Sequence, residues 1–149
     1  MKQLRTISRV LPIIALPLAM LVTGACGDDD STGNQLSNAD VAGDWTLMSF
    51  QIVPQPAFTP PTATGTLHLT DTRYAIVIVR NVTGAPDTVV SDRGSYTLSG
   101  SSWSQTSDDP QVPPLNGSAS LVEQNGNEVL QVNASAGGVD THSFWTRPE

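Results

Sequence analysis

Turn-forming residues interrupt the chain every few residues between positions 41 and 149, and this pattern leaves little room for helices. The segments between the turns are rich in Val, Ile, Thr, Tyr, Phe and Trp, whereas helical periodicity is poor throughout. Short β-prone segments bounded by turn residues are typical of strands. Eight strands are predicted, at residues 43–53, 62–70, 73–82, 88–99, 102–106, 117–124, 128–134 and 139–147.

Alternation within the segments supports this reading. Leu67 and Leu69 share one face of their segment while His68 points to the other, and Leu130 and Val132 share a face in the same way. A period of two with one polar face is what a half-buried strand requires. Residues 75–79 are instead apolar on both faces, which fits either a strand packed on both sides or an apolar outer patch.

Short connections between the strands indicate antiparallel hairpins. Asn125-Gly126-Asn127 is the strongest hairpin signal in the chain. We therefore predict an all-β domain over residues 41–149, namely a small antiparallel up-and-down β-barrel of about eight strands. An immunoglobulin-like β-sandwich is the alternative.

The first residues have the features of an export signal. Lys2, Arg5 and Arg9 precede an uncharged, mostly apolar run at residues 10–22, and small residues follow it. This order is typical of a secretory signal peptide. The apolar run is shorter than the roughly 20 residues that a membrane span needs, so a retained membrane anchor is the weaker reading.

Residues 21–26, Leu-Val-Thr-Gly-Ala-Cys, resemble the lipobox of bacterial lipoproteins. The resemblance implies that residues 1–25 are cut off as a signal peptide and that Cys26 receives a diacylglyceryl group and palmitate. Several acyl chains would hold the protein stably to a membrane. The alternative is an ordinary secreted protein with a chance cysteine at the cleavage site.

Residues 26–40 join the lipidated Cys26 to the domain. They are polar and acidic with almost no large apolar side chains, so we expect a flexible tether. Gly27 follows the cysteine where the inner-membrane retention signal of enterobacteria has Asp. We therefore expect a lipid-anchored protein of the bacterial cell envelope, in the outer membrane, facing the periplasm or the surface.

Charge and cysteine content exclude several classes of function. The chain has seven basic and 14 acidic residues, a net charge of −7. Without residues 1–25 it keeps four arginines against the same 14 acids, which leaves −10. Such an acidic body offers no electrostatic surface for nucleic acid. A single cysteine permits neither an internal disulfide nor a cysteine-based zinc cluster.

Catalytic chemistry is not indicated. His68 and His142 are the only candidate general bases, and no nucleophile motif accompanies them. These two histidines and Asp140 would bind a metal only if their strands adjoin, and we expect two half-exposed strand histidines instead. We therefore predict no enzyme, no catalytic residues, no metal and no cofactor.

A further resemblance lies at the two ends of the domain. Gly43-Asp44-Trp45 opens the first predicted strand, and Trp145-Thr146-Arg147 closes the last. This arrangement resembles the lipocalin superfamily, in which Gly-x-Trp opens the barrel and an Arg of the last strand covers the Trp. The resemblance implies that Trp45 plugs one end of the barrel and that Arg147 stacks on it as a cation–π partner. The domain is shorter than a full lipocalin and lacks its C-terminal helix.

Two functions follow from this reading. In the first, the barrel binds a small hydrophobic molecule or lipid through burial of apolar surface. The residues expected to line the cavity are Leu67, Leu69, Tyr74, Ile76, Ile78, Tyr96, Leu98, Trp103, Leu121, Leu130, Val132 and Phe144. In the second, a filled barrel serves a structural or protein-interaction role with an envelope protein as partner, since a small domain spends most large side chains on its own core. Phe58, in the proline-rich segment 54–61, either caps a cavity mouth or fastens that loop to the barrel.

Overall fold

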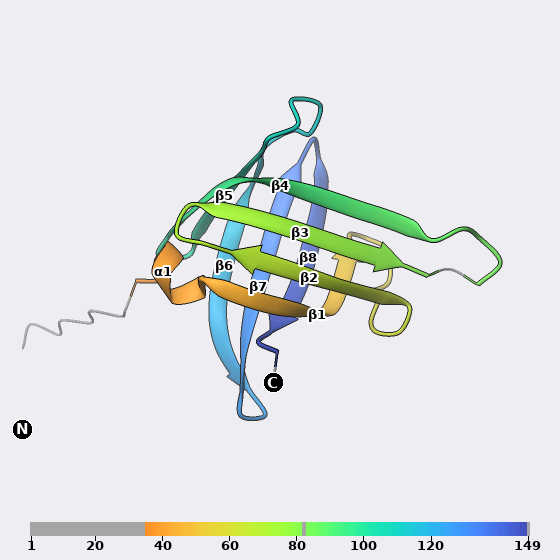
Figure 1. Cartoon of the computed structure of the whole chain (residues 1–149), viewed down its shortest axis with the longest axis horizontal. Helices are drawn as coiled ribbons and strands as arrows, with labels where there is room; N and C mark the ends of the chain where they lie inside the picture. Colours follow the sequence, from red (N-terminus) through yellow and green to blue (C-terminus); the bar gives the residue numbers. More distant parts are fainter. Residues whose placement is uncertain (1–34, 82, 149) are drawn as a thin grey trace, which may run out of the picture. The chain divides into compact units, whose positions relative to one another are not determined.

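The computed structural model describes residues 35–81 and 83–148, which form a closed all-β barrel (Figure 1). The predicted signal peptide, Cys26 and the first part of the tether lie outside the described residues. One short helix precedes the eight strands. The elements are α1 (Asn38–Val41), β1 (Gly43–Ile52), β2 (Ala63–Leu69), β3 (Arg73–Arg80), β4 (Thr88–Ser99), β5 (Ser102–Ser107), β6 (Leu115–Gln124), β7 (Asn127–Ala136) and β8 (Val139–Thr146).

Each strand pairs antiparallel with the next one in sequence, and β1 pairs with β8 to close the sheet. The predicted up-and-down barrel of eight strands is therefore confirmed, and the sandwich alternative is wrong. All eight predicted strands are present. The largest differences are of two residues: β3 ends at Arg80 instead of 82, β6 begins at Leu115 instead of 117, and β7 ends at Ala136 instead of 134. The predicted turn between β6 and β7 is present, with positive φ angles at Asn125 and Gly126.

The barrel has two unlike ends. At the closed end, β1 begins, β8 ends and α1 lies beside them. At the open end, longer connections join β1 to β2, β3 to β4 and β5 to β6. The outer parts of β3 and β4, residues 75–80 and 88–93, run beyond the reach of β5 and are called the β3–β4 arm (Figure 1). The two ends and the arm provide the candidate sites.

Alternating side chains fill the barrel. Inward positions such as Leu67 and Leu69 are buried, whereas His68 between them is exposed, as predicted. A β-bulge between Leu47 and Ser49 shifts the pairing of β1 with β8 by one residue. This shift keeps Phe50 packed against the core although it lies an odd number of residues from Leu47.

Residues 35–40 differ from the sequence expectation, because they contact the barrel instead of belonging wholly to the tether. Leu36 packs against the core and its carbonyl accepts a hydrogen bond from Gly100 N–H at 2.9 Å. The Asn38 side chain accepts a 2.6 Å bond from the backbone of Leu98. The apolar side chain of Leu36 and the side-chain amide of Asn38 thus hold residues 35–40 on the barrel, although the composition of this segment is polar. Among the described residues, no helix is long and apolar enough to cross a membrane.

Candidate functional site

The closed end is sealed by Trp45 and Arg147. The Trp45 side chain is 1% exposed, and the guanidinium carbon of Arg147 lies 4.3 Å from the centroid of its ring. Arg147 also donates hydrogen bonds to the carbonyls of Ala42 at 3.1 Å and Asp40 at 3.2 Å, and its Nε bonds Glu128 at 2.6 Å. This is the geometry that the lipocalin resemblance implies for a plug and its cation–π partner.

Gly43 is needed beneath this cap. Its φ of +132° is unfavourable for residues with side chains, and a Cβ there would lie 2.8 Å from Nη1 of Arg147. Because Gly43 has no side chain, the Arg147 guanidinium can lie directly against the backbone beside Trp45. Trp45 completes the contact by donating its indole N–H to the carbonyl of Val41 at 2.8 Å.

The barrel interior is occupied by its own side chains. Three tryptophans and two tyrosines, Trp45, Trp103, Trp145, Tyr74 and Tyr96, are all nearly fully buried. Of the twelve residues predicted to line a cavity, nine are buried in one hydrophobic cluster: Leu67, Leu69, Tyr74, Ile78, Tyr96, Leu98, Trp103, Leu130 and Val132. Ile76 and Leu121 are half-buried against the same cluster.

Phe144 lies elsewhere. Trp145 takes the inward position on β8, so its neighbour Phe144 faces outward and belongs to no part of the interior cluster. It lines an outer hollow of about 580 Å³ together with Met48 and Val122. The expectation that Phe144 lines an inner cavity is therefore not met, because two adjacent strand residues cannot both point inward.

A small polar network lies among the apolar side chains. Tyr74 donates its hydroxyl to Asp92 Oδ2 at 2.5 Å, and the Ser107 hydroxyl bonds Asp92 Oδ1 at 2.5 Å. Burial, followed by the hydrogen bond to Asp92, raises the pKa of Tyr74 to about 12. These bonds give partners to both oxygens of the half-buried Asp92 carboxylate.

Tyr96 and Trp103 place polar atoms within the buried interior. Their rings stack with centroids 4.9 Å apart, and Tyr96 donates its hydroxyl to the Thr70 carbonyl at 2.7 Å. Burial raises the pKa of Tyr96 to about 12, with a smaller contribution from the charge of Asp71. The indole N–H of Trp103 has no hydrogen-bond partner within the described part of the chain.

The open end is narrowed by the loop between β1 and β2. Phe58 exchanges two backbone hydrogen bonds with Phe50, at 2.9 and 2.7 Å, and packs against the core. The guanidinium carbon of Arg80 lies 4.9 Å from the Phe58 ring centroid. Phe58 thus fastens its loop to the barrel, as one of the two sequence readings proposed, and it also shields Arg80.

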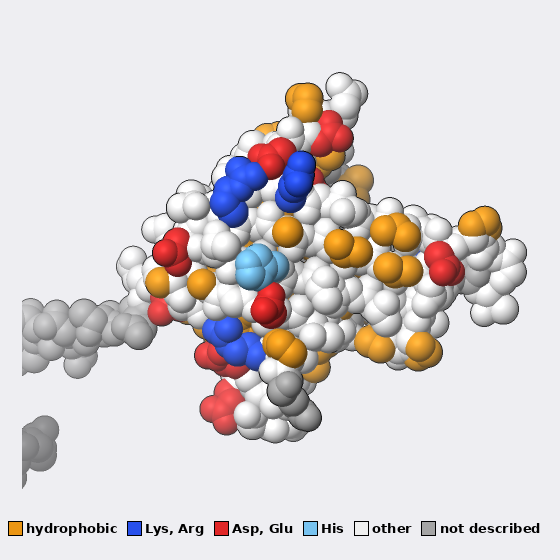
Figure 2. Space-filling model, in the orientation of Figure 1, with side chains coloured by type: hydrophobic (Ala, Val, Ile, Leu, Met, Phe, Trp, Pro, Cys, Tyr) orange, Lys and Arg blue, Asp and Glu red, His pale blue; other side chains and the backbone are white. Residues whose placement is uncertain are grey.

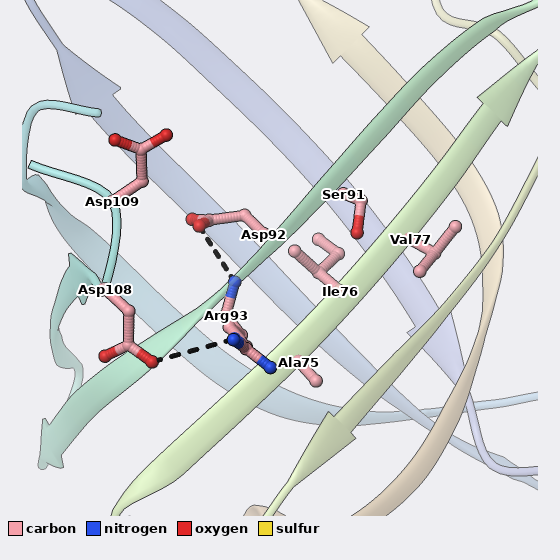
Figure 3. A pocket seen from close by; sticks show the side chains of 8 residues that line it. All are labelled: Ala75, Ile76, Val77, Ser91, Asp92, Arg93, Asp108 and Asp109. Carbon is pink, nitrogen blue, oxygen red and sulfur yellow. Dashed lines mark hydrogen bonds and ion pairs between the residues drawn. The ribbon is translucent and has the colours of Figure 1, made fainter. Parts of the chain in front are cut away.

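The outer surface carries a hollow of about 440 Å³ along the β3–β4 arm (Figure 3). It is lined by Ala75, Ile76, Val77, Ser91, Asp92, Arg93, Asp108 and Asp109. Asp108 forms an ion pair with Arg73 and a longer one, at 3.9 Å, with Arg93. Three of these eight residues are apolar and four are charged, and the hollow is open to solvent.

The two histidines lie apart. His68 contacts Asp44 at 2.6 Å on the exposed surface of β1 and β2. His142 lies on β8, and together with Asp140 it lines a separate shallow hollow. Within residues 35–81 and 83–148, no three His, Cys, Asp or Glu side chains form a group able to hold a metal ion.

Sequence reasoning missed two half-buried charged residues, namely Asp92 and Arg80. Both lie on the inward side of their strands, since Asp92 precedes Tyr96 by four residues and Arg80 follows Ile78 by two. Strand alternation contained this signal. The charged character of both side chains, which usually marks an outward position, hid it.

No protein-family model matches the chain. A search among curated proteins likewise finds no significant match.

Proposed function

We propose that the protein is a lipid-anchored lipoprotein of the bacterial cell envelope, whose filled barrel contacts an envelope protein through its outer surface. The proposed anchor is Cys26, at the end of the lipobox-like residues 21–26. The acidic body, with its lack of a basic surface, fits a partner other than nucleic acid.

The filled interior is the observation that carries this proposal. A site for an apolar ligand is normally a preformed cavity of several hundred Å³. Here Trp45 plugs the closed end of the barrel, Trp103 is buried in its interior, and Phe58 together with Arg80 narrows its open end. The hollows described above, by contrast, open outward beside apolar side chains such as Val77 and Val122. These features support the protein-interaction alternative over enclosure of a small hydrophobic molecule.

Native mass spectrometry tests the filled barrel. Residues 27–149, which contain every strand and the whole core, would be exported without the anchor and incubated with envelope lipid extract. We expect a clean mass without ligand. Trp103→Ala is the matched control, because removal of a buried indole leaves an apolar space that can take up a small molecule. A stoichiometric extra mass on the unsubstituted protein would instead support a lipid or hydrophobic ligand.

Labelling with radioactive palmitate tests the anchor separately. The unsubstituted chain should carry label, whereas Cys26→Ser should remain an uncleaved and unlabelled precursor. Label on the Cys26→Ser variant would show that Cys26 is not the lipidated residue.

A further inference from the structure

Strand β4 extends beyond β3 at the closed end of the barrel. β3 pairs with β4 only as far as Ser95, whereas β4 continues to Ser99. Because strand backbones alternate, the N–H groups of Tyr96, Leu98 and Gly100 all point to the side on which β3 has ended. The first of them donates to a carbonyl in the β2–β3 turn at 3.1 Å. The other two need an acceptor from another part of the chain.

Residues 35–40, here called the latch, supply these acceptors. Leu98 donates its N–H to Oδ1 of Asn38 at 2.6 Å, and Gly100 donates to the carbonyl of Leu36 at 2.9 Å. An isolated antiparallel bridge joins the latch to the end of β4 between these two bonds. The latch thus occupies the place of a missing strand beside the end of β4.

Further contacts fix the latch in this place. Leu36 packs against the core, and the Asn38 side chain also donates to the carbonyl of Asp71 in the β2–β3 turn. The hydroxyl and N–H of Ser37 both donate to the Asp40 carboxylate at 2.7 Å. These two bonds hold the pKa of Asp40 below its usual range. The chain is therefore fastened to the barrel from Leu36 onward.

The latch limits how far the closed end can lie from Cys26. Leu36 follows Cys26 by ten residues, and ten residues in any conformation span at most about 36 Å. Without the latch, the first fastened residue would be the fully buried Val41, and the limit for the fifteen residues after Cys26 would rise to about 54 Å. A lipid on Cys26 is thus kept close to the closed end.

The charge of the body opposes contact of its other faces with lipid. Residues 26–149 carry four arginines, no lysine and 14 acidic residues, a net charge of −10. An anionic lipid surface attracts basic side chains and repels acidic ones, over a Debye length of about 10 Å at 0.1 M salt. The anchor therefore holds one end of the barrel while repulsion acts on the rest.

We propose that the closed end of the barrel faces the lipid surface and that the open end and the β3–β4 arm are presented away from it. The β3–β4 connection lies at the end of the barrel remote from α1 (Figure 1). On the arm, Val77 is 39%, Val89 59% and Val90 50% exposed, and Figure 2 shows hydrophobic side chains gathered there. In this orientation the exposed valines are available to an envelope protein and do not touch lipid.

This inference rests on the proposed function, because it takes Cys26 as the lipidated residue. It adds which end of the barrel the membrane occupies and which end a partner can reach.

Paramagnetic broadening by lipid tests the orientation. Residues 26–149, which contain the latch and every strand, would be coupled through Cys26, the only thiol of the chain, to a maleimide lipid. The lipid would reside in nanodiscs of phosphatidylcholine and phosphatidylglycerol that also contain a gadolinium-chelate lipid, which broadens the NMR signals of nearby amides. We expect strong broadening at Gly100, at the closed end, and little at Gly84 or Val90.

Two results would overturn the proposal. Equal broadening at both ends would show that the barrel has no fixed orientation, and broadening that is strongest at Val89 and Val90 would place the arm on the lipid. Cys26→Ser/Ala85→Cys is the matched control, because it moves the lipid to the exposed β3–β4 connection and should reverse the pattern. The lipid is attached chemically, so the result does not depend on natural lipidation, which palmitate labelling tests separately.

Amide hydrogen exchange tests the latch without a membrane. In Leu36→Ser, loss of the apolar contact should speed exchange of the Leu98 and Gly100 N–H groups by roughly 5- to 10-fold. Leu36 lies outside the eight strands, so the barrel should still fold. Gln35→Ser, at the exposed neighbouring position, is the matched control and should leave both rates unchanged.

The amide of Leu98 is the decisive one, because its acceptor is Asn38 and not the substituted residue. Unchanged exchange at Leu98 in Leu36→Ser would show that residues 35–40 are not held as one unit. The latch would then not set the reach of the anchor, and the proposed orientation would lose its cause.

Discussion

The closed end and the β3–β4 arm use the same strand architecture and reach opposite states. At the closed end Trp45 is 1% exposed, and Arg147 binds two carbonyls, a carboxylate and an aromatic face. In the arm Val89 and Val90 are at least half exposed, and one edge of β4 has no neighbour. The first region concentrates contacts and the second leaves backbone and apolar surface free.

The difference shows how apolar strand residues give stability in one place and an available surface in another. They alternate with polar residues at the closed end, as at Trp45 and Leu47, and are consecutive over residues 75–79 of the arm. Only the closed end has a second layer, formed by α1 and Arg147, that covers what the sheet alone leaves open. Substitutions in the two regions should therefore differ sharply in their cost.

The largest effect is expected at the plug. Trp45→Ala should lower the free energy of unfolding by about 3–5 kcal/mol, because it removes a buried indole and leaves a cavity. Urea denaturation followed by circular dichroism measures this. A loss below about 1 kcal/mol would mean that Trp45 is not the centre of the closed end.

A smaller loss is expected from the covering residue. Arg147→Leu keeps much of the apolar stem but removes the cation–π contact and the bonds to Asp40 and Ala42, at a cost of about 1–3 kcal/mol. Arg93→Leu, at the exposed edge of the arm, is the matched control and should change stability by less than about 0.5 kcal/mol. Equal losses of unfolding free energy in Arg147→Leu and Arg93→Leu would show that the closed end and the arm do not differ in this way.

High pH should act on the interior through its tyrosines. The pKa values of Tyr74 and Tyr96 are raised to about 12 in the folded protein, against about 10 for free tyrosine. The unfolded chain therefore loses these protons first, and stability that is fully present below pH 10 should fall between pH 10 and pH 12. Urea titrations across this range measure the slope.

The matched variant for this experiment is Tyr74→Phe/Tyr96→Phe. It should be less stable at neutral pH but should lose less further stability above pH 10. An equally steep fall in the double variant would attribute the alkaline transition to other groups.

The smallest effect is expected in the arm. Val89→Thr and Val77→Thr should each change the free energy of unfolding by no more than about 0.5 kcal/mol, since both side chains are exposed. A cost similar to that of Arg147→Leu would show that the arm is part of the core.

Strand positions and the barrel class followed from local patterns. Alternation at Leu67 and Leu69 and the turn at Asn125-Gly126 specify strands and a hairpin without reference to distant residues. The contact of Arg147 with Trp45 was expected from a resemblance at the two ends of the domain. The first two signals each lie within a few consecutive residues, and the third combines two short motifs at opposite ends of the domain.

Features that depend on distant neighbours were not predictable. Whether Asp92 would be tolerated on the inward side of β4 depended on Tyr74 and Ser107, which come from two other strands. The free edge of β4 arises because β5 is six residues long and β4 twelve, a mismatch that has meaning only once the strands are paired. Leu36 looked like part of a polar tether because its binding place is built by the β4–β5 turn.

The ladder between β1 and β8 has a consequence for how the chain folds. Seven of the eight ladders join consecutive strands and can form as local hairpins, but the eighth pairs Thr46 with Thr146, a hundred residues apart. Contacts of such long range form late, since the chain must first be gathered by the shorter ones. During folding the sheet therefore passes through an open ribbon with two free edges, and only the pairing of the final strand converts it into a barrel.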